Sequence, residues 1–288
     1  MRIRTTDVPL RLNTPAALRR WSLRCHAAGM SVGLVPTMGA LHAGHLSLVE
    51  RALEECDRVV VSIFVNPTQF APGEDLDRYP RTLEQDLALL ATAGAHAAFL
   101  PAAGDMFPPE FATAVRVGDG LSDRLEGASR PGHFNGVALV VAKLLVAARP
   151  DRAYFGQKDA QQCALVRRLA ADLDTGVEIV VCPTVRDSDG LALSSRNAYL
   201  TAEERVRARA IPAGLAAAAA CFESGERDAA VLTATVRDVL EAAGAAIDYV
   251  AVVDPEHFKE VETPGPGCEI LVAARMGNTR LIDVLQLG

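Results

Sequence analysis

Up to residue 184, two patterns of apolar residues alternate along the chain. Short runs rich in valine, isoleucine and phenylalanine predict buried strands at 32–35, 58–65, 95–100, 152–155 and 177–182. Between them, apolar residues recur every three or four positions and predict helices at 16–28, 46–56, 83–93, 137–148 and 160–173. Strands that alternate with helices are typical of an α/β fold, in which a parallel sheet is wound with helices on both faces.

The pattern changes after residue 184. A polar loop at 186–197 precedes two alanine-rich helices, and period-two runs then predict strands at 247–253, 269–274 and 279–285, with a Pro-Gly turn at 264–267. This order predicts a second, smaller α+β domain. We therefore expect two domains, residues 1–184 and residues 185–288.

Composition narrows the class of protein. The 288 residues are 50% hydrophobic and carry a net charge of −7, which argues against nucleic acid or an anionic membrane as the main partner. We see neither a membrane-spanning apolar run nor a signal peptide, so we expect a cytoplasmic protein. The six cysteines lie far apart, without metal-site spacing, and we interpret them as reduced structural thiols.

The segment from Thr37 to His45, TMGALHAGH, leaves the first predicted strand and leads into a helical pattern. His42 and His45 fall at the predicted helix N-terminus, where free backbone N–H groups and the helix dipole attract phosphate. Histidine can donate to a phosphoryl oxygen and carry charge near neutral pH. The segment predicts a phosphate site, although a turn with two capping histidines is an alternative.

Polar residues also follow other predicted strands, at the sheet edge where parallel α/β proteins bind ligands. Asn66 and Gln69 carry amides suited to a small substrate's hydroxyl or carboxylate groups, or they satisfy a local proline turn. Lys158 suits a phosphate, while Asp159 suits either ribose hydroxyls or a helix cap with Gln162 as its partner.

Three further segments are candidates. Ser194, Ser195 and Arg196 predict a polyphosphate clamp on a loop that closes over nucleotide, unless the loop is simply solvated. Asp86, at a predicted helix start, is a candidate ligand of a phosphate-bridging Mg²⁺, or it serves the helix dipole. In Arg130–Val137, His133 and Asn135 are pocket candidates, with helix capping as the alternative.

Taken in order, six segments resemble the pantothenate synthetase family, the pantoate–β-alanine ligases of the HxGH nucleotidyltransferase superfamily: PTMGALHAGH, FVNPTQF, EDLDRYPRT, RPGHFNGV, FGQKDAQQ and LSSRN. The resemblance covers nearly the whole chain and implies a Rossmann-like, doubly wound sheet, a C-terminal lid domain and a homodimer. It also implies ligation of pantoate and β-alanine in two steps, through a pantoyl adenylate, with release of pyrophosphate and then AMP. Magnesium would accompany ATP as substrate, and no tightly bound organic cofactor is expected.

The resemblance also assigns residues. The catalytic candidates are His42, His45, Lys158 and Arg196. The ATP site would comprise Met38, Gly39, Ala40, Leu41, His42, Ala43, Gly44, His45, Gly156, Gln157, Lys158, Asp159, Val185, Leu193, Ser194, Ser195 and Arg196. Gln69, Gln162 and Asn66 would hold pantoate or β-alanine.

Two other functions stay open on the sequence. An HxGH nucleotidyltransferase that forms a dinucleotide product would share the nucleotide site without a pocket for an amine. A nucleotide-sensing module of the same fold would lack catalysis altogether. The presence of both histidines, Lys158 and Arg196 favours catalysis.

Overall fold

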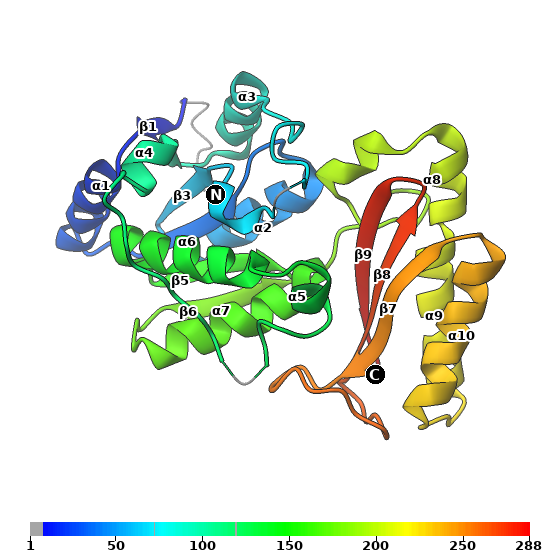
Figure 1. Ribbon diagram of the computed structural model, residues 1–288. Helices are drawn as coiled ribbons and strands as arrows, with labels where there is room; N and C mark the ends of the chain where they lie inside the picture. The colour runs from blue at the N-terminus through cyan, green and yellow to red at the C-terminus, as the bar shows by residue number, and fades with distance from the viewer. Residues whose placement is uncertain (1–7, 72, 119) are drawn as a thin grey trace. The chain divides into compact units, whose positions relative to one another are not determined.

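A computed structural model describes residues 8–71, 73–118 and 120–288. The chain forms two compact units (Figure 1). Unit 1 comprises Met1–Gly156 and Leu165–Cys182, and unit 2 comprises Gln157–Ala164 and Pro183–Gly288. The short segment 157–164 thus groups with the C-terminal part of the chain, although it lies within the sequence range expected for the first domain.

Unit 1 is built on a six-stranded sheet with the order β1-β4-β3-β2-β5-β6. Every neighbouring pair in it is parallel, which confirms the α/β prediction. The strands are β1 (Leu10–Leu12), β2 (Val32–Thr37), β3 (Arg58–Ile63), β4 (Ala97–Phe99), β5 (Arg152–Gly156) and β6 (Glu178–Cys182). From β2 the chain winds outward through β3 and β4, then returns to β5 on the other side of β2.

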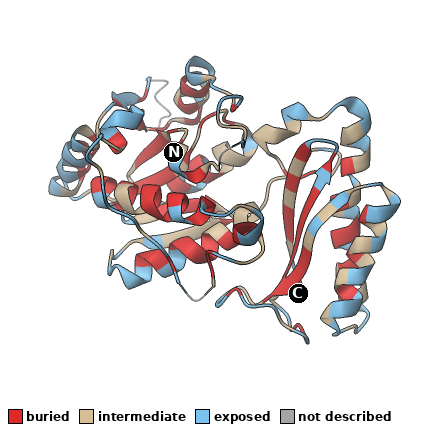
Figure 2. Cartoon of the chain, viewed as in Figure 1, coloured by how far each residue is buried: buried red, intermediate tan, exposed pale blue. Residues whose placement is uncertain are grey.

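Helices cover this sheet in two pairs. One pair is α1 with α6, and the other is α2 with α3. Apolar side chains of α2 and α3 form a core with those of β2 and β3, among them Val35, Val49, Val61 and Leu90. Figure 2 shows that the strands of this sheet are largely buried. The helical elements of unit 1 are α1 (Pro15–Ala27), α2 (Ala43–Glu55), η1 (Pro67–Gln69), α3 (Leu83–Ala93), α4 (Ala103–Met106), α5 (Glu126–Ser129) and α6 (His133–Ala148). Helix η2 (Gln157–Asp159) belongs to unit 2, and α7 (Ala160–Asp172) begins in unit 2 and continues in unit 1 from Leu165.

Unit 2 is the expected α+β domain. Its antiparallel sheet has the order β7-β8-β9, and α9 and α10 pack together beside it. Leu215, Leu232 and Val236 from the helices share a core with Val250 and Val272 from the strands. The elements are η3 (Ser195–Tyr199), α8 (Ala202–Ala208), α9 (Ala210–Glu223), α10 (Ala229–Ala242), β7 (Ala246–Val253), β8 (Glu269–Met276) and β9 (Thr279–Gln286).

Several element boundaries differ from the pattern-based prediction. Helix α2 begins at Ala43 and α6 at His133, three and four residues before the predicted starts at 46 and 137. These first turns are polar or glycine-containing, so apolar periodicity does not mark them. Strand β1 was not predicted because it has three residues and pairs only with β4. Three helices, not two, follow residue 200 because Thr201 and Glu204 form a capping box that starts α8.

All six cysteines carry thiols and not disulfides. Cys25, Cys56 and Cys182 are buried in unit 1, and burial raises the pKa of each thiol. These cysteines are therefore poor nucleophiles at neutral pH, which fits the interpretation as structural thiols. In the three described ranges, every helix is too short or too polar to traverse a bilayer.

Candidate active site

The strand order of unit 1 indicates where a ligand would bind. The chain leaves β2 in one direction toward β3 and later returns to β5, so β2 and β5 are neighbours at the point where the winding reverses. Ligands of open parallel sheets bind beyond the carboxyl ends of such strands. Met38–His45 follow β2, Asn66 and Gln69 follow the adjacent β3, and Gly156 ends β5. The topology thus brings three of the predicted segments to one edge of the sheet.

The turn after β2 has an unusual backbone. Gly39 and Ala40 both have positive φ, 85° and 50°, and positive φ is uncommon for a residue with a side chain. The Gly39 N–H donates to Thr37 Oγ1 at 3.2 Å, and that hydroxyl donates to the Ser62 carbonyl at 2.6 Å. The turn then enters α2 with His42 in an extended conformation as the N-cap residue.

The two histidines of this turn lie side by side. Their ring centroids are 4.1 Å apart, and the ring planes are inclined by 35°. The His42 backbone N–H donates to His45 Nδ1 in a long, 3.4 Å hydrogen bond. In a neutral imidazole that accepts at Nδ1, Nε2 carries the proton. His45 is thereby arranged to donate from Nε2 in the first turn of α2, where the helix dipole favours an anion.

Asp86, the predicted magnesium ligand, lies directly behind this turn. Asp86 is buried, with 1% of the residue exposed. Oδ1 accepts the Leu41 N–H at 2.8 Å and Oδ2 accepts the Ala40 N–H at 3.0 Å. The Thr82 hydroxyl adds a third bond to Oδ1 at 3.2 Å. Three neutral donors and near-complete burial do not fit a carboxylate that coordinates a hydrated magnesium ion.

Asn66 and Gln69 form a buried amide pair. Asn66 Nδ2 donates to Gln69 Oε1 at 3.0 Å and to the Gly136 carbonyl at 3.1 Å, while Asn66 Oδ1 accepts the Thr68 N–H at 3.2 Å. Asn66 therefore uses its side chain to shape the loop. Gln69 Nε2 lies 3.2 Å from Met38 Sδ, which is a weak acceptor, so the amide keeps donor capacity for a ligand.

A second layer of charged residues supports Gln69. Arg130 forms two 2.8 Å hydrogen bonds with the Glu74 carboxylate. Burial alone would raise the pKa of Glu74, but the Arg130 bonds outweigh it and the pKa is lowered. Arg130 Nη1 also lies 3.1 Å from His133 Nε2, and His133 Nδ1 lies 2.8 Å from the Gln69 carbonyl. A neutral His133 that donates from Nδ1 satisfies both contacts.

His133 makes unit 1 sensitive to acid. Burial, reinforced by the Arg130 charge, lowers the pKa of His133 to about 4. An unfolded histidine takes up a proton as the pH falls through about 6.5, whereas the folded His133 does so only near pH 4. The contribution of His133 to the free energy of unfolding is therefore complete above about pH 6.5 and declines as the pH falls from there to about 4. When the pH falls from about 7 to about 5, we expect the free energy of unfolding to drop by about 2 kcal/mol more in the native protein than in His133→Gln.

Denaturant unfolding followed by fluorescence measures this difference, because the chain's one tryptophan, Trp21, is buried in α1 of unit 1. The matched control is His257→Gln, whose ring lies in an exposed turn of unit 2. Equal pH dependence of the native protein and His133→Gln would contradict a neutral, buried His133.

In unit 2, two segments with predicted site residues contact the same strand, β9. The first is η2, where Gln157 Nε2 donates to Glu269 Oε1 at 3.1 Å and Lys158 Nζ lies 3.9 Å from Asp159 Oδ2. Lys158 is mostly buried, with a side chain 18% exposed. Gln162 is half-buried in the first turn of α7. The second segment is η3, which contains Ser195 and Arg196.

The loop that leads into η3 is held at its base. Leu193 N–H donates to the Val185 carbonyl at 2.9 Å, which pairs these two predicted site residues. Arg186 forms a two-point ion pair with the buried Asp283, at 2.6 and 3.0 Å. Ser194 caps η3, because its Oγ accepts the Arg196 N–H at 3.3 Å. The segment 185–196 is thus a hairpin whose base is held by these contacts and whose end leads into η3.

The structure therefore gathers the predicted residues into two groups. Unit 1 holds Met38–His45, Asn66, Gln69, Asp86 and Gly156, and unit 2 holds Gln157, Lys158, Asp159, Gln162, Val185 and Leu193–Arg196. Their individual roles stay predictions. Sequence reasoning missed the Glu74–Arg130 pair, whose partners are 56 positions apart, and Gly136, whose carbonyl holds Asn66. In the sequence, the one signal for the Glu74–Arg130 pair was the arginine at the start of the RPGH segment.

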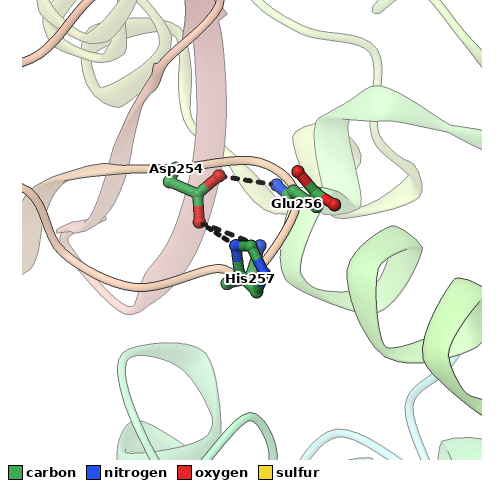
Figure 3. A group of neighbouring side chains, drawn as sticks. All are labelled: Asp254, Glu256 and His257. Carbon is green, nitrogen blue, oxygen red and sulfur yellow. Dashed lines mark hydrogen bonds and ion pairs between the residues drawn. The ribbon is translucent and has the colours of Figure 1, made fainter.

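One further group of ligating side chains lies in the turn after β7 (Figure 3). Asp254 accepts the backbone N–H groups of Glu256 and His257 at 3.0 and 2.9 Å, and the His257 ring at 3.1 Å. Burial pushes the pKa of Asp254 up, but these hydrogen bonds lower it overall. Local turn geometry accounts for the arrangement, so we assign no metal to it.

Known proteins resemble this chain over most of its length. The sequence profile of the pantoate-beta-alanine ligase family matches residues 11–286. The pantothenate synthetase of Acidobacterium capsulatum is 55% identical over 259 residues, which cover 90% of this chain and 86% of the relative.

Solved structures agree. The pantothenate synthetase of Thermus thermophilus has a TM-score of 0.90 at 46% identity, covering 96% of this chain and 99% of that one. The pantoate-beta-alanine ligase of Francisella tularensis, crystallised with beta-gamma ATP and β-alanine, has a TM-score of 0.79 at 33% identity, covering 96% and 97%. The profile match over almost the full length, together with these identities, shows that the chain belongs to the pantoate–β-alanine ligase family.

Proposed function

We propose that this chain joins pantoate to β-alanine at the expense of ATP, through a pantoyl adenylate. Membership of the family supports the reaction, and the ligands in the Francisella tularensis crystal support two of its substrates. The observation that carries the proposal is the His42–His45 pair at the start of α2, beyond the strand where the sheet reverses its winding. An anion site there, together with the buried Gln69 amide that keeps donor capacity, suits a nucleotide and a small polar acid.

In the first step, a pantoate carboxylate oxygen attacks the α-phosphorus of ATP. A phosphorus–oxygen bond forms, the bond to the bridging oxygen breaks, and pyrophosphate leaves. In the second step, the β-alanine amine attacks the pantoyl carbonyl, a carbon–nitrogen bond forms, AMP leaves and the amine loses a proton. Both steps need positioned substrates and stabilised phosphate charge, and neither needs a covalent enzyme intermediate.

Different side chains have separate roles in these two steps. His45 Nε2, set as a donor by the bond at Nδ1, stabilises the transferring phosphate together with His42 and the first backbone N–H groups of α2. Lys158 and Arg196 neutralise charge on the β- and γ-phosphates, with Ser194 and Ser195 beside them. Gly156, Gln157, Asp159 and Val185 line the nucleotide, and Gln69 and Gln162 hold pantoate. Asn66 acts through Gln69, whose amide it orients.

Magnesium enters as part of the ATP complex, where it neutralises phosphate charge. The Asp86 carboxylate does not fit as its ligand, because it is buried and already bound by three neutral donors. We also propose a homodimer, located in the cytoplasm, with no nucleic-acid or membrane partner. The reduced, widely separated thiols support a reducing compartment.

A substrate-omission assay on the purified protein tests this function. Sustained production of AMP and pyrophosphate is expected only when ATP, pantoate and β-alanine are all present. A dinucleotide-forming enzyme would release pyrophosphate without AMP, given a nucleotide acceptor. A nucleotide-sensing module would bind ATP and release neither product. Sustained AMP release without β-alanine would contradict the proposed second step.

The pantoate site predicts a selective loss of affinity. Gln69→Ala or Gln162→Ala removes an amide that pairs with a substrate hydroxyl or carboxylate, so KM for pantoate should rise about 10- to 100-fold, or about 1 to 3 kcal/mol, with KM for ATP little changed. Steady-state kinetics with each substrate varied in turn measures both values. Gln85→Ala is the matched control, because this glutamine is exposed on α3. Equal effects on pantoate and ATP would remove these amides from the pantoate site.

A further inference from the structure

Asp86 connects two elements that are far apart in the sequence. It lies in the first turn of α3, and its carboxylate binds the backbone of the turn between β2 and α2, 46 positions earlier. Each oxygen accepts one N–H group, from Leu41 at 2.8 Å and from Ala40 at 3.0 Å. Since Asp86 is almost fully buried, these bonds are shielded from water.

The bound turn has a conformation that needs support. Ala40, with φ of 50°, occupies the left-handed region, which is strained for a residue with a Cβ atom. A Cβ atom at position 39 would lie 3.0 Å from Asp86 Oδ2, so glycine there leaves room for the carboxylate. Without Asp86, the N–H groups of Ala40 and Leu41 would lose their acceptors inside the protein, which is costly. The carboxylate thus offsets both the strain and the burial of these two donors.

The same turn ends at His42, whose N–H contacts His45 Nδ1. The backbone at 40–41 therefore determines where the two rings and the first turn of α2 stand. We propose that Asp86 is a positioning residue for the phosphate-binding turn and acts through the backbone of Ala40 and Leu41. This inference rests on the proposed function, because it gives the turn the role of binding ATP phosphates.

Asp86→Asn tests the role with little change in size. One amide oxygen keeps a bond, but the new NH₂ group faces an N–H donor and repels it. We expect KM and Kd for ATP to rise at least about 10-fold, while KM for β-alanine stays within about twofold. Hydrogen exchange in peptides covering 38–45 should accelerate without any ligand present, and the magnesium concentration for half-maximal rate should not change.

Glu84→Gln is the matched control, since this carboxylate lies in the same turn of α3 but is exposed. It forms an ion pair with Arg11, whose side chain is also exposed. This variant should leave all five quantities unchanged. A merely destabilised protein would show a lower kcat from a smaller active fraction, with KM for ATP unchanged. A raised KM for ATP therefore indicates a positioning role, whereas a lowered kcat with unchanged KM for ATP indicates loss of fold.

Thr82→Val, which removes only the hydroxyl bond to Oδ1, decides the question if Asp86→Asn does not fold. It should raise Kd for ATP in the same direction by a smaller factor. Unchanged ATP affinity and hydrogen exchange in folded Asp86→Asn, or in Thr82→Val where Asp86→Asn does not fold, would overturn the proposal. Rescue of Asp86→Asn by excess magnesium would overturn it as well. ATP binding and exchange are measured without pantoate, so they remain informative even if the native protein fails the substrate-omission assay.

Discussion

His45→Ala is expected to lower the rate of pantoyl adenylate formation by about 100-fold or more, the effect of losing one preorganised donor to developing phosphate charge. The fold should persist, because removing the ring leaves the backbone of α2 and the apolar core beneath it intact. Single-turnover release of pyrophosphate from ATP and pantoate measures this step directly. His45→Gln should recover part of the rate, since its amide can still donate.

The control is His257→Ala, which removes a ring from the turn after β7 and should leave the rate unchanged. If folded His45→Ala releases pyrophosphate at a near-native rate, His45 does not stabilise the transferring phosphate. The helix N–H groups would then carry that task by themselves.

Gly136→Ala is expected to reduce kcat/KM for pantoate by about 100-fold or more. A Cβ atom at this position would lie 2.2 Å from the Thr68 carbonyl oxygen and 2.6 Å from the Gln69 nitrogen. Both contacts are with backbone atoms, so α6 and the η1 loop must move apart. That movement breaks the bond from Asn66 to the Gly136 carbonyl and displaces the Gln69 amide.

Gly104→Ala provides the comparison, because a Cβ atom there meets nothing within 4 Å. This variant should match the native protein in activity and stability. Kinetics with pantoate varied, together with denaturant unfolding, distinguish a displaced loop from a general loss of fold. A native KM for pantoate in Gly136→Ala would mean that the η1 loop does not hold the substrate.

Sequence patterns predicted the fold well where the signal is local. Buried strands are continuous apolar runs, so they can be read directly from the sequence. The segments beyond the carboxyl ends of β2, β3 and β5 were likewise predicted as the candidate site, because the order of strands and helices fixes that edge. Strand β1 escaped prediction since an edge strand of three residues has no period.

Long-range partners were not predictable in the same way. An acidic residue in the first turn of a helix suggests either the helix dipole or a metal, and nothing near Asp86 in the sequence indicates its backbone partners at Ala40 and Leu41. The link from Glu74 through Arg130 to His133 likewise exists only after folding. Such contacts depend on tertiary packing, which a single sequence does not encode as a period or a spacing.

The way in which Asp86 holds the phosphate-binding turn bears on how this enzyme can evolve. It recognises N–H groups that every residue except proline possesses, so it places no demand on the side chains at positions 40 and 41. The anchor therefore holds the turn whatever those side chains are, while the left-handed backbone at position 40 and the core packing of Leu41 restrict them separately. Position 39 is different, because any side chain there meets both the left-handed backbone and the carboxylate itself. Substitutions beside the anchor should therefore be limited by local packing and backbone, whereas the anchor itself forbids them at the glycine.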